Sequence, residues 1–176
     1  MTRLSKAFFI LLFLSIAVHD LCAQSGQEFS LTGRITAEVI PVFSVSETSQ
    51  MNFGRFSPGP QGGEIVLTPQ NTISVLGSVY SQTGLHNAAS FYVSGNEDAA
   101  FSITLPGNPV LITNTGNSRT MRVEQWVSHP APGTGTGMLQ NGFQVVNVGA
   151  TLKVGTLIDN PVGIYTGTYT ITFDFN

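Results

Sequence analysis

The sequence predicts an all-β fold, a β-sandwich, and three observations support this prediction. Apolar and polar residues alternate with a period of two almost throughout, which is typical of half-buried strands. Glycine, proline and asparagine divide these runs into eight to ten short segments. No stretch has the i, i+3, i+4, i+7 apolar spacing of a helix. Many short strands in one unit of about 150 residues favour a sandwich.

The expected strands follow one another at short intervals. The first covers residues 29–39 and ends at Pro41, because proline cannot donate to a sheet ladder. Others are expected at residues 51–53, 64–68, 73–76, 90–93, 100–105, 110–113, 120–127, 143–154 and 163–175. In residues 120–127 the alternation places Met121 and Val123 on one face and Trp126 on the other. Residues 129–142 are rich in glycine and proline, and we expect a mobile loop there.

The first 23 residues have the pattern of a cleavable export signal. Arg3 and Lys6 precede an apolar run at residues 7–18, which is too short to cross a bilayer, and Ala23 offers a cleavage site. Cleavage would remove Cys22, the single cysteine, so the mature chain could form no internal disulfide. We expect an exported protein, periplasmic in transit and then at the cell surface or extracellular, with no membrane span after cleavage. Residues 24–36 would be an N-terminal extension, and residues 37–176 one domain.

The charge pattern argues against nucleic acid as a partner. Removing Arg3, Lys6 and Asp20 from the seven basic and ten acidic residues leaves five and nine. Charged residues make up 10% of the chain, against about 25% in an average globular protein. Phosphate binding requires clustered lysine and arginine, which this chain lacks.

No recognisable catalytic site is present, and we expect that the protein is not an enzyme. His86 and His129 have no second histidine or acid at metal-ligand spacing. The glycines at residues 133–137 are followed by neither a helix nor a lysine, as phosphate-binding loops require. Glu97 and Asp98 are typical of a solvated turn. We therefore predict no catalytic, cofactor-binding or metal-binding residues.

The last expected strand is the most regular one. Its apolar face carries two tyrosines, an isoleucine and two phenylalanines, and its other face is a row of threonines ending in Asp174. In an isolated domain such a strand would be an unprotected edge that tends to pair with another chain.

Both ends of the mature sequence resemble those of chaperone–usher pilins. Gly163 and the penultimate Phe175 occupy positions that are similar to a glycine and an aromatic residue of the pilin C-terminal strand. The alternation of Phe29, Leu31, Gly33 and Ile35 is similar to a pilin donor strand. The resemblance implies an immunoglobulin-like, pilin-like sandwich that assembles by strand addition. The partner-binding residues it implies are Phe29, Leu31, Gly33, Ile35, Gly163, Tyr165, Tyr169, Ile171, Phe173 and Phe175.

A second resemblance covers nearly the whole mature chain. The runs that carry it lie at residues 37–41, 51–54, 62–63, 100–106, 148–154 and 163–169. They are similar to a bacterial family of secreted proteins of unknown function, which itself resembles fimbrial subunits and spore-coat-U-like proteins. One departure from pilins is that many of them tie their first strand with a disulfide, which this mature chain cannot form.

These observations predict a structural subunit of a bacterial surface fibre or coat. Its partners would be further copies or other pilin-like subunits, together with a periplasmic chaperone. The alternative is a self-complete secreted sandwich that binds carbohydrate or a surface protein, in which residues 29–39 are the domain's own first strand. A secreted hydrolase is the remaining alternative.

Overall fold

The computed structural model describes residues 28–39, 43–82 and 86–175, and the chain divides into two units, residues 1–39 and 40–176. The expected signal peptide and Cys22 lie outside the described residues. In the first unit, residues 28–39 form neither helix nor strand, although their alternation predicted a strand. Alternation reports which side chains a strand could bury, but a strand also needs a neighbour for its backbone hydrogen bonds.

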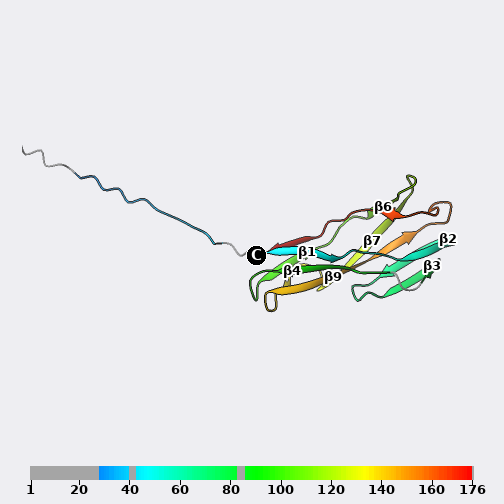
Figure 1. The fold of residues 1–176 in the computed structure, drawn as a ribbon, viewed down its shortest axis with the longest axis horizontal. Coiled ribbons are helices and arrows are strands. Elements are labelled where there is room, and N and C mark those ends of the chain that lie inside the picture. Colours follow the sequence, from blue (N-terminus) through cyan, green and yellow to red (C-terminus); the bar gives the residue numbers. More distant parts are fainter. Residues whose placement is uncertain (1–27, 40–42, 83–85, 176) are drawn as a thin grey trace, which may run out of the picture. The chain divides into compact units, whose positions relative to one another are not determined.

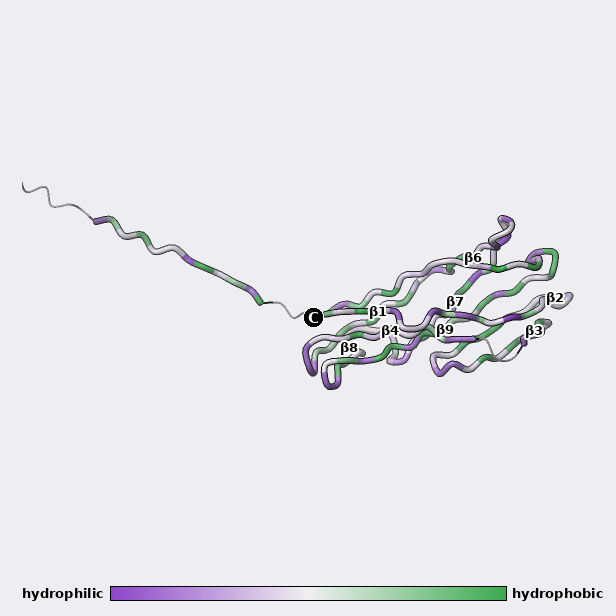
Figure 2. The backbone as a smooth tube through the Cα atoms, in the orientation of Figure 1, coloured by the Kyte–Doolittle hydropathy of each residue, from purple (hydrophilic) through white to green (hydrophobic). Residues whose placement is uncertain are grey.

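The second unit is all-β, as the sequence predicted, and the described residues contain no helix (Figure 1). Figure 2 shows hydrophobic and hydrophilic residues alternating along many of its strands. The strands are β1 (Ser44–Ser49), β2 (Arg55–Leu67), β3 (Ile73–Gln82), β4 (Ala89–Ser94), β5 (Ala100–Thr104), β6 (Val110–Asn114), β7 (Thr120–His129), β8 (Gly133–Met138), β9 (Phe143–Val154), β10 (Tyr165–Thr166) and β11 (Thr172–Phe175).

The strands form two antiparallel sheets. The larger has the order β1-β4-β9-β7-β6-β10, and β2 also joins it by pairing with both β9 and β3. The smaller has the order β11-β5-β8. The last two strands of the chain therefore belong to different sheets.

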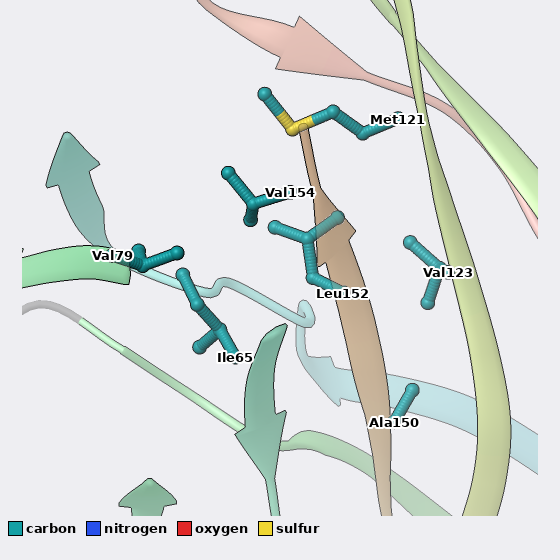
Figure 3. Packing of buried hydrophobic residues seen from close by; sticks show 7 residues of the cluster. All are labelled: Ile65, Val79, Met121, Val123, Ala150, Leu152 and Val154. Atoms are coloured by element: carbon teal, nitrogen blue, oxygen red, sulfur yellow. The ribbon is translucent and has the colours of Figure 1, made fainter. Parts of the chain in front are cut away.

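Strand β9 organises the larger sheet. Its first half pairs with β4 and its second half with β2, while β7 lies along its other edge. Leu152 of β9 lies directly opposite Ile65 of β2 and Val123 of β7, so three apolar side chains share one face. In Figure 3, Leu152 and Val154 lie between Ile65 and Val79 on one side and Met121 and Val123 on the other.

A second core cluster joins the two sheets. It combines Val93 of β4 and Val146 and Val148 of β9 with Phe101 and Ile103 of β5, and all five side chains are buried. Because β5 belongs to the smaller sheet, this cluster fixes the two sheets against each other.

The polar face of the larger sheet carries a small charge network. Lys153 binds Glu64 on the neighbouring strand, and its Nζ lies 3.4 Å from Oε1 of Glu124. The hydrogen bond to Glu64, opposed by partial burial, raises the pKa of Lys153 above its usual value. All three side chains are partly exposed, so solvent screens the pairs and reduces their contribution to stability.

Two strands were not expected from the sequence. Strand β1 lies in a polar stretch that shows no apolar alternation, and it pairs with β4. Strand β8 lies inside the segment that we expected to be a mobile loop, and it pairs with β5.

None of the described residues forms a helix that is long and apolar enough to cross a bilayer.

Candidate functional site

A groove of about 1160 Å³ opens in the second unit. One wall is formed by residues 50–58, which precede and begin β2, and the other by residues 163–171, near the C-terminus. Core side chains of the larger sheet form part of its lining, including Met121, Val123 and Leu152. The groove therefore reaches the hydrophobic core rather than only the surface.

The C-terminal wall has free backbone groups. Strand β10 pairs with β6 in the larger sheet, and β11 pairs with β5 in the smaller sheet. Between them, residues 167–171 take part in no strand pairing within the part of the chain that the structure describes. The single long strand predicted for residues 163–175 is thus divided, and its middle is an open edge where another strand could pair.

Strand β1, whose Glu47 lines the groove, is another open edge. Strand β1 is the first strand of the larger sheet and pairs only with β4 among the described strands. Val45 lies directly opposite the fully buried Val93, so both face inward, yet Val45 is 41% exposed. The interior next to β1 is therefore incompletely covered.

Aromatic contacts anchor the end of the C-terminal wall. The ring of Phe173 lies 5.7 Å from Phe91 and 6.1 Å from Phe101, measured between ring centroids. Phe175 stacks on Phe43 with centroids 3.5 Å apart. The two strands at the start and end of this unit are thereby held near each other, although no described hydrogen-bonded pairing joins β1 to β11.

At the other end of this wall, Gly163 is required by close packing. A Cβ atom built there would collide with the side-chain amide of Asn114, and the residue has a φ of +158°. Asn114 is buried, and its Oδ1 accepts a hydrogen bond of 2.9 Å from the N–H of Gly116. A side chain at position 163 would disturb this turn.

Trp126 and Tyr169 meet in the groove lining. Their ring centroids are 4.8 Å apart, and Trp126 packs against both core clusters. Among the described residues, Trp126 Nε1 and the Tyr169 hydroxyl are the buried side-chain polar atoms that have no hydrogen-bond partner. Burial, with a smaller contribution from Glu47, raises the pKa of Tyr169 to about 12. An unpaired buried donor typically costs about 1–3 kcal/mol.

Trp126 corrects one prediction from the sequence. The alternation placed it on the face opposite Met121 and Val123, but it packs against the same core cluster as these residues. The pairing of β7 with β9 shifts register between Glu124 and Val127, and Gln125 has a φ of +54°. Such a bulge adds one residue to the strand and reverses the alternation that follows it.

The structure places the ten predicted partner-binding residues in three locations. Gly163, Tyr165, Tyr169 and Ile171 line the groove. Phe173 and Phe175 lie in β11 and pack against the core that joins the sheets. The other four lie in the first unit, where Phe29, Leu31 and Ile35 are 87–98% exposed and Gly33 is exposed.

Sequence reasoning missed the wall of the groove near β2. Phe53 and Phe56 line it, and both pack against the first core cluster. Phe53 was expected only as part of a short strand, and Phe56 lies between the strands expected at residues 51–53 and 64–68. The groove depends on which distant segments meet, and alternation within each segment does not report this.

The second unit is thus an all-β domain of two antiparallel sheets with an open apolar groove beside its last strands. The chain matches the family described as a domain of unknown function, DUF4402, over residues 43–175, and it belongs to that family. This match confirms the expectation that the chain belongs to a family of unknown function. The match concerns no fimbrial or spore-coat-U-like protein, so that part of the resemblance stays a prediction. No protein with a curated description matches the chain.

Proposed function

We propose that this protein is a structural subunit of a bacterial surface fibre or coat, and that its domain is an incomplete, immunoglobulin-like, pilin-like sandwich. Residues 29–35 of one copy would fill the groove of the next copy. The observation that carries the proposal is the groove itself, whose C-terminal wall has an unpaired stretch at residues 167–171.

The length of the donor segment suits the groove. Seven residues in a β conformation span about 20 Å, and the unpaired stretch together with β10 also has seven residues. A strand placed there could pair with the free backbone groups of residues 167–171, which is strand addition to an open sheet edge.

The side chains of the donor segment suit an apolar site. Phe29, Leu31 and Ile35 are almost fully exposed, and burying such a side chain contributes about 1.5–3 kcal/mol each. The sum is several kcal/mol before backbone hydrogen bonds, comparable with the stability of a small domain, about 5–15 kcal/mol. Gly33 lacks a Cβ and would let the segment pass where large groove side chains approach, such as Trp126 and Tyr169.

The same reasoning supports the proposed cellular route. A subunit with an open apolar groove would be liable to aggregate before assembly, which favours a chaperone that covers the groove in the periplasm. In the proposed route, the predicted signal peptide directs export of the subunit. The subunit then crosses the periplasm with its chaperone and assembles at the surface.

Charge substitutions on one face of the donor segment test the proposal. Leu31→Asp together with Ile35→Asp should abolish heat-resistant ladders on gels, since both carboxylates would enter an apolar groove. The matched control, Ser30→Asp with Thr32→Asp, adds the same charge to the opposite face of the same segment, and this variant should still form the ladders.

A synthetic peptide of residues 28–39 distinguishes the proposal from its alternative. Added to the Leu31→Asp, Ile35→Asp subunit, it should bind the groove and change the fluorescence of Trp126, the single tryptophan of the chain. If the wild-type protein is instead a stable monomer that these substitutions unfold, residues 29–39 are the domain's own first strand and the proposal is wrong.

A further inference from the structure

A second candidate site lies on the outer face of β1, β4 and β9. On β4, Ala89 and Val93 are fully buried, so Ser90, Tyr92 and Ser94 point away from the core. Residues directly opposite share this outer face, and Tyr92 lies between Ser46 of β1 and Val145 of β9. None of the residues that line the pocket on this face also lines the groove.

Two aromatic rings form an exposed platform on this face. Tyr92 and Phe143 stack with their ring centroids 5.5 Å apart and an interplanar angle of 18°. They are 38% and 44% exposed, although aromatic side chains usually bury much of their surface. The two ring planes are nearly parallel, and the exposed parts of both rings offer an apolar surface to a ligand.

A polar pocket lies next to the platform. It has a volume of about 330 Å³, and Ser90 and Asn147 are among the residues that line it. Ser90 of β4 pairs with Asn147 of β9, and this pair lies two residues along the strands from the pair of Tyr92 and Val145. Ser49, Gln70, Asn71 and Asn87 also line it. All eight lining residues are uncharged. The volume is at the lower end of the range for small-molecule sites, about 300–1,000 Å³.

Hydrogen bonds already fix two of the asparagine side chains. Asn147 Oδ1 accepts the hydroxyl of Ser90, and Asn71 Oδ1 accepts the N–H of Ala88 at 2.8 Å. Each asparagine therefore has its Nδ2 amide left to donate to a ligand. Asn87 is held by reciprocal backbone hydrogen bonds of 2.8 Å with Asn52.

We propose that this face binds a neutral oligosaccharide, with one sugar ring stacked on Tyr92 and Phe143 and the next in the polar pocket. A sugar has an apolar C–H face and hydroxyl groups that both donate and accept hydrogen bonds. The platform complements the first feature, and the fixed amides and serine hydroxyls complement the second. The lack of lysine and arginine in the pocket disfavours acidic sugars.

Calorimetric titration of the full secreted chain tests this site. The probes are the neutral hexasaccharides of cellulose, laminarin and starch, with hexagalacturonate as the charged comparison. At least one neutral probe should bind, and Tyr92→Ala and Gln70→Ala should each weaken its binding at least tenfold. The matched controls are Leu111→Ala, which removes an exposed apolar side chain of β6, and Asn108→Ala in an exposed turn, and both should bind as the wild type does.

Several results would overturn the proposal. They are the absence of heat with all three neutral probes, preferential binding of hexagalacturonate, or equal weakening by the control variants. Near-ultraviolet circular dichroism shows whether each variant is folded, and Gln70 is exposed in a turn, so its variant tests the site even if Tyr92→Ala does not fold. The site does not rest on strand donation, so the donor-segment variant Leu31→Asp, Ile35→Asp should bind the sugar as the wild type does.

Discussion

Trp126 and Tyr169 are unusual because buried polar groups in proteins are nearly always paired. Tyr165, on the same wall of the groove, follows the usual rule, since its hydroxyl donates to the carbonyl of Pro161 at 2.8 Å. The unassembled domain thus carries two unpaired donors at one location in the groove lining. The main-chain carbonyls of an inserted strand are acceptors of the kind that these donors lack.

The two tyrosines give a matched pair of substitutions. Tyr169→Phe removes an unpaired buried hydroxyl and should raise the free energy of unfolding of the unassembled chain by about 1 kcal/mol. Tyr165→Phe removes a paired hydroxyl and should lower it by about 1 kcal/mol. Urea unfolding of both variants, carried out in the Leu31→Asp, Ile35→Asp background to prevent assembly, measures the difference. Changes of the same sign would show that the Tyr169 hydroxyl has a partner in solution.

At the scale of the elements, the strands with regular apolar alternation could be predicted from the sequence, whereas β1 and β8 could not. Strand β1 is polar because its inward face is only partly covered, so few apolar residues mark it. Strand β8 has glycines where other strands have apolar side chains. At Gly137 a Cβ atom would collide with the ring of Phe101, so the absence of a side chain allows this ring to pack.

The C-terminal wall shows a second reason for incomplete prediction. Its alternation is as predicted, since Tyr165, Tyr169, Ile171 and Phe173 are each less exposed than their immediate neighbours. The change from pairing with β6 to pairing with β5 depends on the positions of those strands, which local sequence does not encode. The groove that results from this change was therefore not predictable from the strand itself.

The end of β8 tests whether this segment is structural. Leu139 follows β8 and is fully buried, whereas the adjacent Met138 is 49% exposed. Leu139→Ala should therefore lower the free energy of unfolding by about 2–5 kcal/mol, and Met138→Ala by much less. Thermal unfolding of the two variants measures the contrast. Equal, small effects would restore the interpretation of residues 129–142 as a mobile loop.

At the scale of the whole molecule, the two units carry complementary features. The first unit has exposed apolar side chains at alternate positions and no secondary structure in its described residues. The second unit has an apolar groove with open strand edges. The apolar side chains of the first unit in one copy would match the apolar groove of the second unit in another copy. This complementarity is the basis of the proposed assembly.

Crosslinking between two distinguishable copies tests strand donation most directly. One copy carries Leu31→Cys, and the other, with a mass tag, carries Tyr169→Cys or Ile171→Cys on the inward face of the C-terminal wall. The single natural cysteine lies in the predicted signal peptide, so the engineered thiols would have no competitor in the mature chain. The matched control replaces the exposed Thr170 instead. A mixed disulfide-linked dimer with position 169 or 171, but not with position 170, is the result that strand donation predicts. The contradictory result comes from a chain that carries both cysteines: disulfides formed only within single chains would show that the segment completes its own domain.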